Sequence, residues 1–338
     1  MKMKRSLIVA AMLAVASFAS AQELNLFAWS EYVPQSVIDG FTEETGIKVN
    51  YESYDSNEAM VAKLVGGGGT YDLIQPSEYM IEALIAADRL MPIDRANIPN
   101  FSNLSPQYLD LPFDPANKYS VPYMVGTVGI AVNTAKVTKP VTGYADFFSD
   151  AHKGRLVVLD DGREIVSWAL AAKGRSINDI TPATLAEVKP LIAAWLKNVK
   201  IFDSASPKTA LLNGEVDMGI VWSGEGAILI QEDPKFTYIL PKEGAHMFID
   251  SLAIPKGAKN KAAAEKFINY ILKPEVSKVI SDEFPYTNPN LEARKLLTEE
   301  QLKNGASYPA TGKLETFKEI GNVATQIDDL MTELKSEL

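Results

Sequence analysis

The first third of the chain alternates short apolar runs with segments in which apolar residues recur every three or four positions. The run "LNLFAWSEY" (24–32) predicts a strand that ends in a polar loop, and "IKVNYESY" (47–54) predicts a second strand. A helix that ends at Gly46 lies between them. A further helix starts near residues 55–58 and leads to a third strand at 71–77. This order predicts an α/β unit with a parallel sheet.

The same pattern restarts farther along the chain. Strands are predicted at 128–132, 155–159, 200–202, 218–222 and 248–255, with helices near 164–173, 182–197, 206–214 and 259–274. Further helices follow to the C-terminus. We therefore expect two α/β lobes. In open α/β sheets ligands bind beyond the carboxyl ends of the strands, so the site is expected in the loops there.

The first 21 residues have the pattern of an export signal. Cations at three of the first five positions precede an apolar run at 7–15, and residues 19–21 form a small-residue cleavage signature. We expect cleavage after Ala21 and a periplasmic protein, with a retained N-terminal anchor as the alternative. No later run approaches the ~18 apolar residues of a membrane-spanning helix.

Composition narrows the classes of function. The chain has 338 residues, 46% of them hydrophobic, and a formal net charge of -10, which argues against nucleic acid as a partner. It contains no cysteine, which fits a periplasmic protein and excludes thiolate catalysis. His152 and His246 have no partner four residues away, and no cofactor motif or nucleophile–base set is found. We expect no metal, no cofactor and no catalytic residues.

The candidate site residues follow predicted strand ends or begin the returning strand, and they combine aromatic rings with carboxylates. They are Trp29, Tyr32, Ser77, Tyr79, Asp161, Glu164, Trp222, Glu225, Phe248 and Asp250. Trp168 and Trp195 lie within helical patterns and are assigned to the core. Ring faces attract cations by about 0.5–2 kcal/mol, and ammonium–carboxylate hydrogen bonds contribute about 1.5–3 kcal/mol each. Several ammonium groups joined by methylenes would use both.

The segment "VVLDDGRE" (157–164) crowds three carboxylates at the mouth of a predicted strand. Like charges this close repel one another unless a cation lies among them. Asp161 and Glu164 are therefore predicted to hold a cationic ligand, whereas Asp160 is predicted to cap the following helix. A solvated loop with a capping Asp explains the spacing equally well. A glycosidase with paired carboxylates is a further alternative, because spacing in sequence gives no distance between them.

Longer stretches of the sequence carry a resemblance to a known family. They include "WSEYVPQSVIDGFTEETGIKV" (29–49), "YDLIQPSEY" (71–79), "FDPANKYSVPYMVGTVGIAVN" (113–133), "PKEGAHMFIDSLAIP" (241–255) and "NPNLEARKLL" (288–297). They resemble the periplasmic polyamine-binding proteins of spermidine/putrescine ABC importers, over nearly the whole chain after the signal. The resemblance implies a monomeric, type II-like periplasmic binding protein. Each lobe would hold a mixed sheet flanked by helices, and the protein would close over a polyamine and deliver it to an ABC permease.

The resemblance also implies lobes built from discontinuous segments. Residues 22–126 and 251–296 would form lobe 1, and residues 127–250 and 297–338 would form lobe 2. The ligand cleft would lie between the lobes.

The family's ligand contacts match residues of this chain one by one. The matches are Trp29, Tyr32, Tyr79, Trp222, Phe248 and Tyr286 among the aromatic contacts, Asp161, Glu164 and Asp250 among the acidic contacts, and Ser77 as a polar contact. Phe248 and Glu225 resemble putrescine-binding members, whereas Asp161 and Glu164 resemble spermidine-binding members. Phe317 aligns with a Gln contact of the latter. Four carboxylates favour a triamine, so we expect spermidine ahead of putrescine. Another cationic or zwitterionic solute, and a polyamine sensor, are the alternatives.

Overall fold

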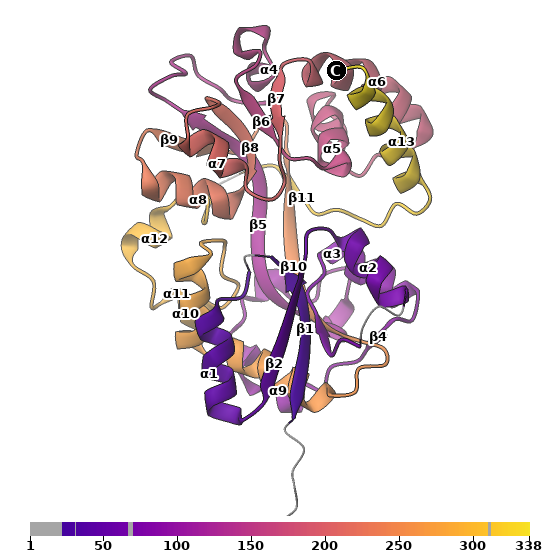
Figure 1. The fold of residues 1–338 in the computed structure, drawn as a ribbon, viewed down its shortest axis with the longest axis vertical. Coiled ribbons are helices and arrows are strands. Elements are labelled where there is room, and N and C mark those ends of the chain that lie inside the picture. The colour runs from indigo at the N-terminus through magenta and orange to yellow at the C-terminus, as the bar shows by residue number, and fades with distance from the viewer. Residues whose placement is uncertain (1–21, 31, 67–69, 310–311) are drawn as a thin grey trace, which may run out of the picture.

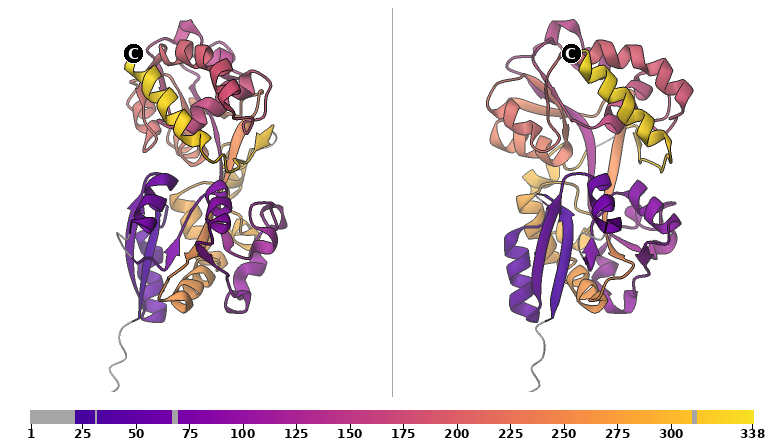
Figure 2. Two further views of the ribbon diagram at one scale, coloured as in Figure 1. Left: turned by 90° about the vertical axis from the view of Figure 1, so that its right-hand side faces the viewer. Right: turned by 45° about the vertical axis from the view of Figure 1, so that its right-hand side comes forward.

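The computed structural model describes residues 22–30, 32–66, 70–309 and 312–338. The expected signal segment and its cleavage site lie outside these residues. The chain forms two lobes, one above the other, joined at a narrow waist (Figure 1, Figure 2). Strands run through both lobes and helices flank them, so the predicted two-lobed α/β architecture is confirmed. Within the described ranges, every helix is too short or too polar to cross a membrane.

The lower lobe in Figure 1 begins with the three strands predicted near the N-terminus. They are β1 (Glu23–Trp29), β2 (Lys48–Tyr54) and β3 (Leu73–Ile74), and the helices that follow them are α1 (Gln35–Thr45), α2 (Asn57–Val65) and α3 (Glu78–Ala86). β1 pairs in parallel with both β2 and β3. As predicted, α1 ends at Gly46, which has a left-handed φ of 70°. The hydroxyl of Ser56 caps α2 by accepting the N–H of Ala59 at 3.1 Å.

β3 is shorter than the strand predicted at 71–77. The ladder stops after Ile74 because Pro76 has no N–H to donate. The N–H of Ser77 donates instead to the side-chain oxygen of Asn57 at 3.2 Å. The chain then turns into α3, which leaves Ser77 and Tyr79 just beyond the carboxyl end of β3.

The upper lobe holds the second set of predicted strands. They are β6 (Leu156–Val158), β7 (Val199–Phe202), β8 (Met218–Trp222) and β9 (Phe236–Ile239), with β6 parallel to both β7 and β8. The helices of this lobe are α4 (Tyr144–Phe147), α5 (Gly162–Ala172), α6 (Pro182–Leu196), α7 (Pro207–Leu212), α8 (Ser223–Glu232) and α13 (Val323–Ser336). Trp168 on α5 and Trp195 on α6 are buried, as predicted for core residues.

Two long strands pass through both lobes. β5 (Ser120–Asn133) and β10 (Ala245–Pro255) run antiparallel, with Met247 opposite Thr127 and Ala253 opposite Ser120. β5 continues into pairing with β8 and β9, and β10 pairs with β3 and with β4 (Leu90–Met91). The strand order β2-β1-β3-β10-β5-β8-β6-β7 is therefore a mixed sheet. β5 is longer than predicted because all its residues are buried, so no apolar–polar alternation marks its first half.

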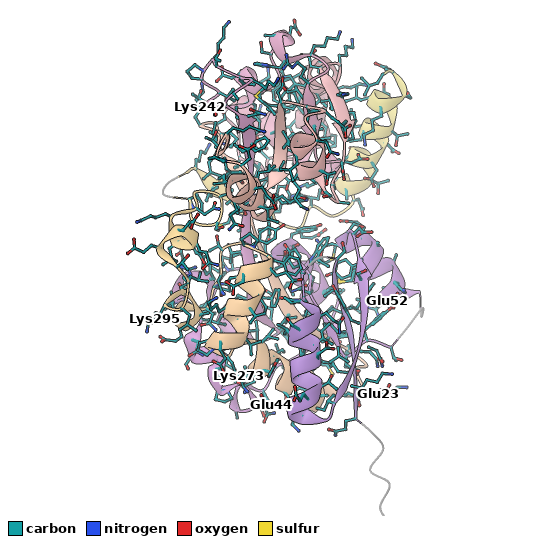
Figure 3. All side chains as sticks on the ribbon, turned by 60° about the vertical axis from the view of Figure 1, so that its left-hand side comes forward. Glu23, Glu44, Glu52, Lys242, Lys273 and Lys295 are labelled. Atoms are coloured by element: carbon teal, nitrogen blue, oxygen red, sulfur yellow. The ribbon has the colours of Figure 1, made fainter. Side chains whose placement is uncertain are left out.

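The C-terminal part of the chain returns to both lobes. Its elements are α9 (Lys261–Ile271), α10 (Pro274–Glu283), α11 (Leu291–Arg294), α12 (Glu299–Lys303) and β11 (Leu314–Glu315), which pairs in parallel with β10. Short 3-10 turns occupy Arg95–Asn97, Pro99–Asn103, Pro106–Tyr108, Pro115–Asn117 and Asp150–His152. Glu44 at the end of α1 pairs at 2.6 Å with Lys273, which precedes α10 (Figure 3). We propose that the lobes divide after residues 126, 250 and 296, where the chain passes between them.

Candidate functional site

The eleven candidate residues line one pocket between the lobes. Its volume is about 220 Å³. The lower lobe contributes Trp29, Tyr32, Ser77, Tyr79 and Tyr286, the upper lobe contributes Asp161, Glu164, Trp222 and Glu225, and the crossing strand β10 contributes Phe248 and Asp250. Most of these side chains follow the carboxyl ends of strands, which is where open α/β sheets bind ligands.

Aromatic rings form a connected wall along the pocket. Phe248 meets the ring of Trp222 at 5.6 Å and the ring of Tyr286 at 5.9 Å, both edge to face. Tyr32 lies 5.4 Å from Tyr286 and 6.4 Å from Trp29. The wall thus joins residues of β1, β8 and β10 across both lobes, and its ring faces can take the alkyl stem and the charges of an organic cation.

Two glycines make room for this wall. A Cβ atom at Gly126 would clash with the ring of Phe248, and one at Gly224 would clash with the ring of Tyr286. Neither glycine was singled out from the sequence. Because glycine has no side chain, each ring can lie directly against the backbone. The positions of Phe248 and Tyr286 therefore depend on glycine at positions 126 and 224.

Asp250 is a deeply buried acidic group of the pocket. The hydroxyl of Tyr32 donates to its Oδ2 at 2.9 Å, and the hydroxyl of Ser77 donates to its Oδ1 at 2.6 Å. Its exposed fraction is 3%. Burial raises the pKa of Asp250 to about 7, although both hydroxyls favour the ionised form. A cation that reached this carboxylate would therefore be strongly attracted to it.

Asp161 lines the pocket and also caps a helix. It is the N-cap of α5, because its Oδ1 accepts the N–H of Glu164 at 3.0 Å. The cap was expected at Asp160, which pairs instead with Lys335. The helix begins at Gly162, so the extended residue just before it supplies the cap. Burial and the neighbouring Glu164 raise the pKa of Asp161 to about 6.

Glu164 lies in the pocket lining but is already engaged with other side chains. Its Oε1 lies 2.6 Å from Nδ1 of His246, and its Oε2 accepts the indole N–H of Trp168 at 3.2 Å. The other ring nitrogen of His246, Nε2, lies 3.2 Å from Oε1 of Glu78. Glu78 in turn accepts the backbone N–H of Ile249 at 2.9 Å. A chain of glutamate, histidine and glutamate thus runs from the lower lobe to the upper lobe.

Glu225 is also paired within the protein. Nζ of Lys208, on α7, lies 2.9 Å from Oε1 of Glu225 and 3.1 Å from Oγ of Ser206. Both Lys208 and Glu225 line the pocket and both are largely buried.

Several side chains at the site, among them His246, Lys208 and Glu78, were not identified from the sequence. His246 and Lys208 both line the pocket, and Glu78 supports His246 from below. Their partners are distant in sequence, so no local spacing reveals the pairs. Phe317, noted only from the resemblance, stacks on the ring of His246 at 3.6 Å. Among the residues that the structure describes, no acidic and histidine groups are arranged to hold a metal ion.

Comparison with known proteins identifies the class. Residues 36–310 match the family described as bacterial extracellular solute-binding protein, and this chain belongs to that family. It is 38% identical to a spermidine/putrescine-binding periplasmic protein of Salmonella typhimurium, over 99% of each chain. A solved structure from Listeria monocytogenes is 33% identical, with a TM-score of 0.90 over 94% of this chain and 100% of that chain. The spermidine/putrescine ABC transporter substrate-binding protein PotD from Streptococcus pneumoniae is 34% identical, with a TM-score of 0.81 over 93% of this chain and 99% of that chain.

Membership of this family decides between a solute-binding protein and a glycosidase. The protein is a solute-binding protein and not an enzyme, so the glycosidase interpretation of its carboxylates is set aside. The solved relatives also share the two-lobed fold over almost the full chain. The pocket between the lobes is therefore the candidate solute site.

Proposed function

We propose that this protein binds a polyamine outside the cytoplasm and delivers it to the permease of an ABC importer. The observation that supports this most directly is Asp250, a buried carboxyl group that accepts a hydrogen bond from Tyr32 and shares the pocket lining with the rings of Phe248 and Tyr286. No cation forms an ion pair with Asp250 among the described residues. The names of the relatives, which are spermidine- and putrescine-binding proteins, point to the same ligand class.

The energetics of such a site are sufficient for useful affinity. Two charge-assisted hydrogen bonds, at Asp161 and Asp250, contribute roughly 3–6 kcal/mol, and two ring contacts add roughly 1–4 kcal/mol. Desolvation inside a closed pocket strengthens these contacts, while ordering a flexible ligand opposes binding. The balance supports binding in the micromolar range or tighter, which corresponds to about -8 kcal/mol.

The rest of the proposal concerns delivery. The lobes are joined by the strands β5 and β10, so they can close over a ligand by bending these strands. The closed monomer would then dock on its permease, and the first 21 residues would direct export to the periplasm before cleavage after Ala21. The periplasmic and transporter names of the relatives support this part of the proposal.

Calorimetric titration tests the proposed ligand class. The mature protein is unfolded and refolded to remove any bound ligand, and is then titrated with putrescine, spermidine and spermine. We expect one-to-one binding of at least one of them. Asp39→Asn, on the exposed face of α1, is the control that should leave binding unchanged. If none of the three amines binds to the refolded protein, the proposed function is wrong.

Transport is tested in cells. Deleting the coding sequence from its host should reduce uptake of labelled polyamine, and the intact sequence should restore it. Unchanged uptake in the deletion strain would contradict delivery to a permease and favour a sensor instead.

A further inference from the structure

The four acidic candidates of the pocket differ in the partners they already have. Glu164 faces His246, and Glu225 faces Lys208. Asp161 and Asp250 accept hydrogen bonds only from backbone N–H groups or hydroxyls among the described residues. Glu164 and Glu225 thus each form an ion pair within the protein, whereas Asp161 and Asp250 form none among the described residues.

The geometry around His246 fits its charged form. Each ring nitrogen lies within hydrogen-bonding distance of a carboxylate oxygen, 2.6 Å at Glu164 and 3.2 Å at Glu78. A neutral imidazole has only one N–H, so one nitrogen lone pair would face a carboxylate. Glu78 also accepts the backbone N–H groups of Ile249 at 2.9 Å and Phe317 at 3.0 Å. An imidazolium satisfies both carboxylates.

The electrostatic surroundings support this assignment. Burial alone would lower the pKa of His246, but Glu164 and Glu78 together raise it to about 9. The exposed fractions of the side chains are 5% for His246, 1% for Glu164 and 0% for Glu78, so water screens these charges little.

Lys208 forms an ion pair with Glu225, as His246 does with Glu164. It is half of an ion pair whose exposed side-chain fractions are 17% for Lys208 and 7% for Glu225. Its ammonium group already lies in the pocket lining, beside the carboxylate that a ligand ammonium would otherwise contact. The remaining acidic groups of the lining, Asp55, Glu58 and Asp160, are exposed and can be solvated by water.

We propose that His246 and Lys208 are built-in counter-ions that set the charge of the preferred ligand. They occupy Glu164 and Glu225, leave Asp161 and Asp250 for ammonium groups, and make an alkane diamine the preferred ligand over a triamine. This inference rests on the proposed polyamine-binding function. Its physical reason is desolvation, because a third ammonium would enter the pocket without a carboxylate of its own. It reverses the preference expected from counting four carboxylates in the sequence.

The inference is tested by ligand preference and not by affinity alone. Wild-type protein, His246→Gln and Lys208→Gln are stripped of ligand and titrated calorimetrically with putrescine and spermidine. Wild type should bind putrescine more tightly. Each substitution releases one carboxylate, so the ratio of the spermidine Kd to the putrescine Kd should fall at least tenfold in each variant. Lys189→Gln, which breaks a surface pair with Glu333, is the matched control and should leave the ratio unchanged.

The outcomes separate the two levels of the proposal. Wild-type protein that binds neither these two amines nor spermine would overturn the polyamine function itself. Wild-type protein that prefers spermidine, or variants that weaken both amines in parallel, would leave that function standing and overturn the counter-ion assignment. Lys208 lies nearer the surface than His246, so Lys208→Gln provides a second test if His246→Gln does not fold.

Discussion

Replacing Asp250 with Asn should weaken polyamine binding and also make the ligand-free protein more stable at alkaline pH. Burial raises the pKa of Asp250 from 3.8 to about 7. The folded protein therefore holds this proton more tightly than the unfolded chain does. The contribution of Asp250 to stability is greatest at acidic pH and declines as the pH rises from about 4 to 7.

The size of both effects follows from the structure. A pKa shift from 3.8 to about 7 corresponds to about 4 kcal/mol of lost stability once the group is ionised. Asn carries no charge, and its amide can still pair with the hydroxyls of Tyr32 and Ser77. It should therefore recover much of that free energy at pH 8 and little at pH 4.5. The lost charge-assisted hydrogen bond, about 1.5–3 kcal/mol, should weaken binding about 10- to 150-fold.

Urea denaturation followed by circular dichroism at pH 4.5 and pH 8 measures the stability effect, and calorimetric titration measures the affinity. Asp39→Asn, an exposed residue of α1, is the matched control. If Asp250→Asn changes the free energy of unfolding equally at both pH values, the burial argument is refuted. An unchanged Kd would remove Asp250 from the site.

Further predictions concern pH, the aromatic wall and the core. The pKa values of Asp161 and Asp250 are raised to about 6 and about 7, and both groups must be ionised to hold ammonium groups. Polyamine affinity should therefore fall from pH 8 to pH 5.5, and calorimetric titration in buffers of different ionisation enthalpy should detect proton release on binding. A constant Kd over this range would contradict the prediction. Gly126→Ala should displace Phe248, weaken binding and cost about 1–3 kcal/mol of stability. Binding equal to wild type would show that this close approach is unimportant. Trp168→Ala should reduce the free energy of unfolding in urea by about 3–5 kcal/mol, because the side chain is fully buried; a loss below 1 kcal/mol would contradict its place in the core.

The gathering of the candidate residues at one pocket could be predicted because it depends on local signals. Hydrophobic periodicity places the strand ends, and the fold gathers those ends at one pocket, so residues as distant in sequence as Trp29 and Trp222 line the same space. The capping residue of α5 was misplaced by one position, since Asp160 and Asp161 are equally good caps by residue type.

The charge balance of the site could not be predicted in the same way. It depends on pairs such as His246 with Glu78 and Lys208 with Glu225, in which neither partner stands at a helical or strand spacing from the other. A histidine without a nearby partner in sequence was therefore seen as isolated, although two carboxylates enclose it. Counting acidic residues gave the composition of the pocket but not its net charge.

The crossing strand β10 also constrains the order in which the chain can fold. The sheet of the lower lobe runs β2-β1-β3-β10, and Ile74 of β3 pairs with Ala253. That lobe therefore cannot complete its sheet until most of the polypeptide has been made. Such late pairing raises the contact order and slows folding. Under the proposed export, this arrangement gives the chain time to cross a membrane before it folds, because the strand that completes its first lobe emerges only after residue 244.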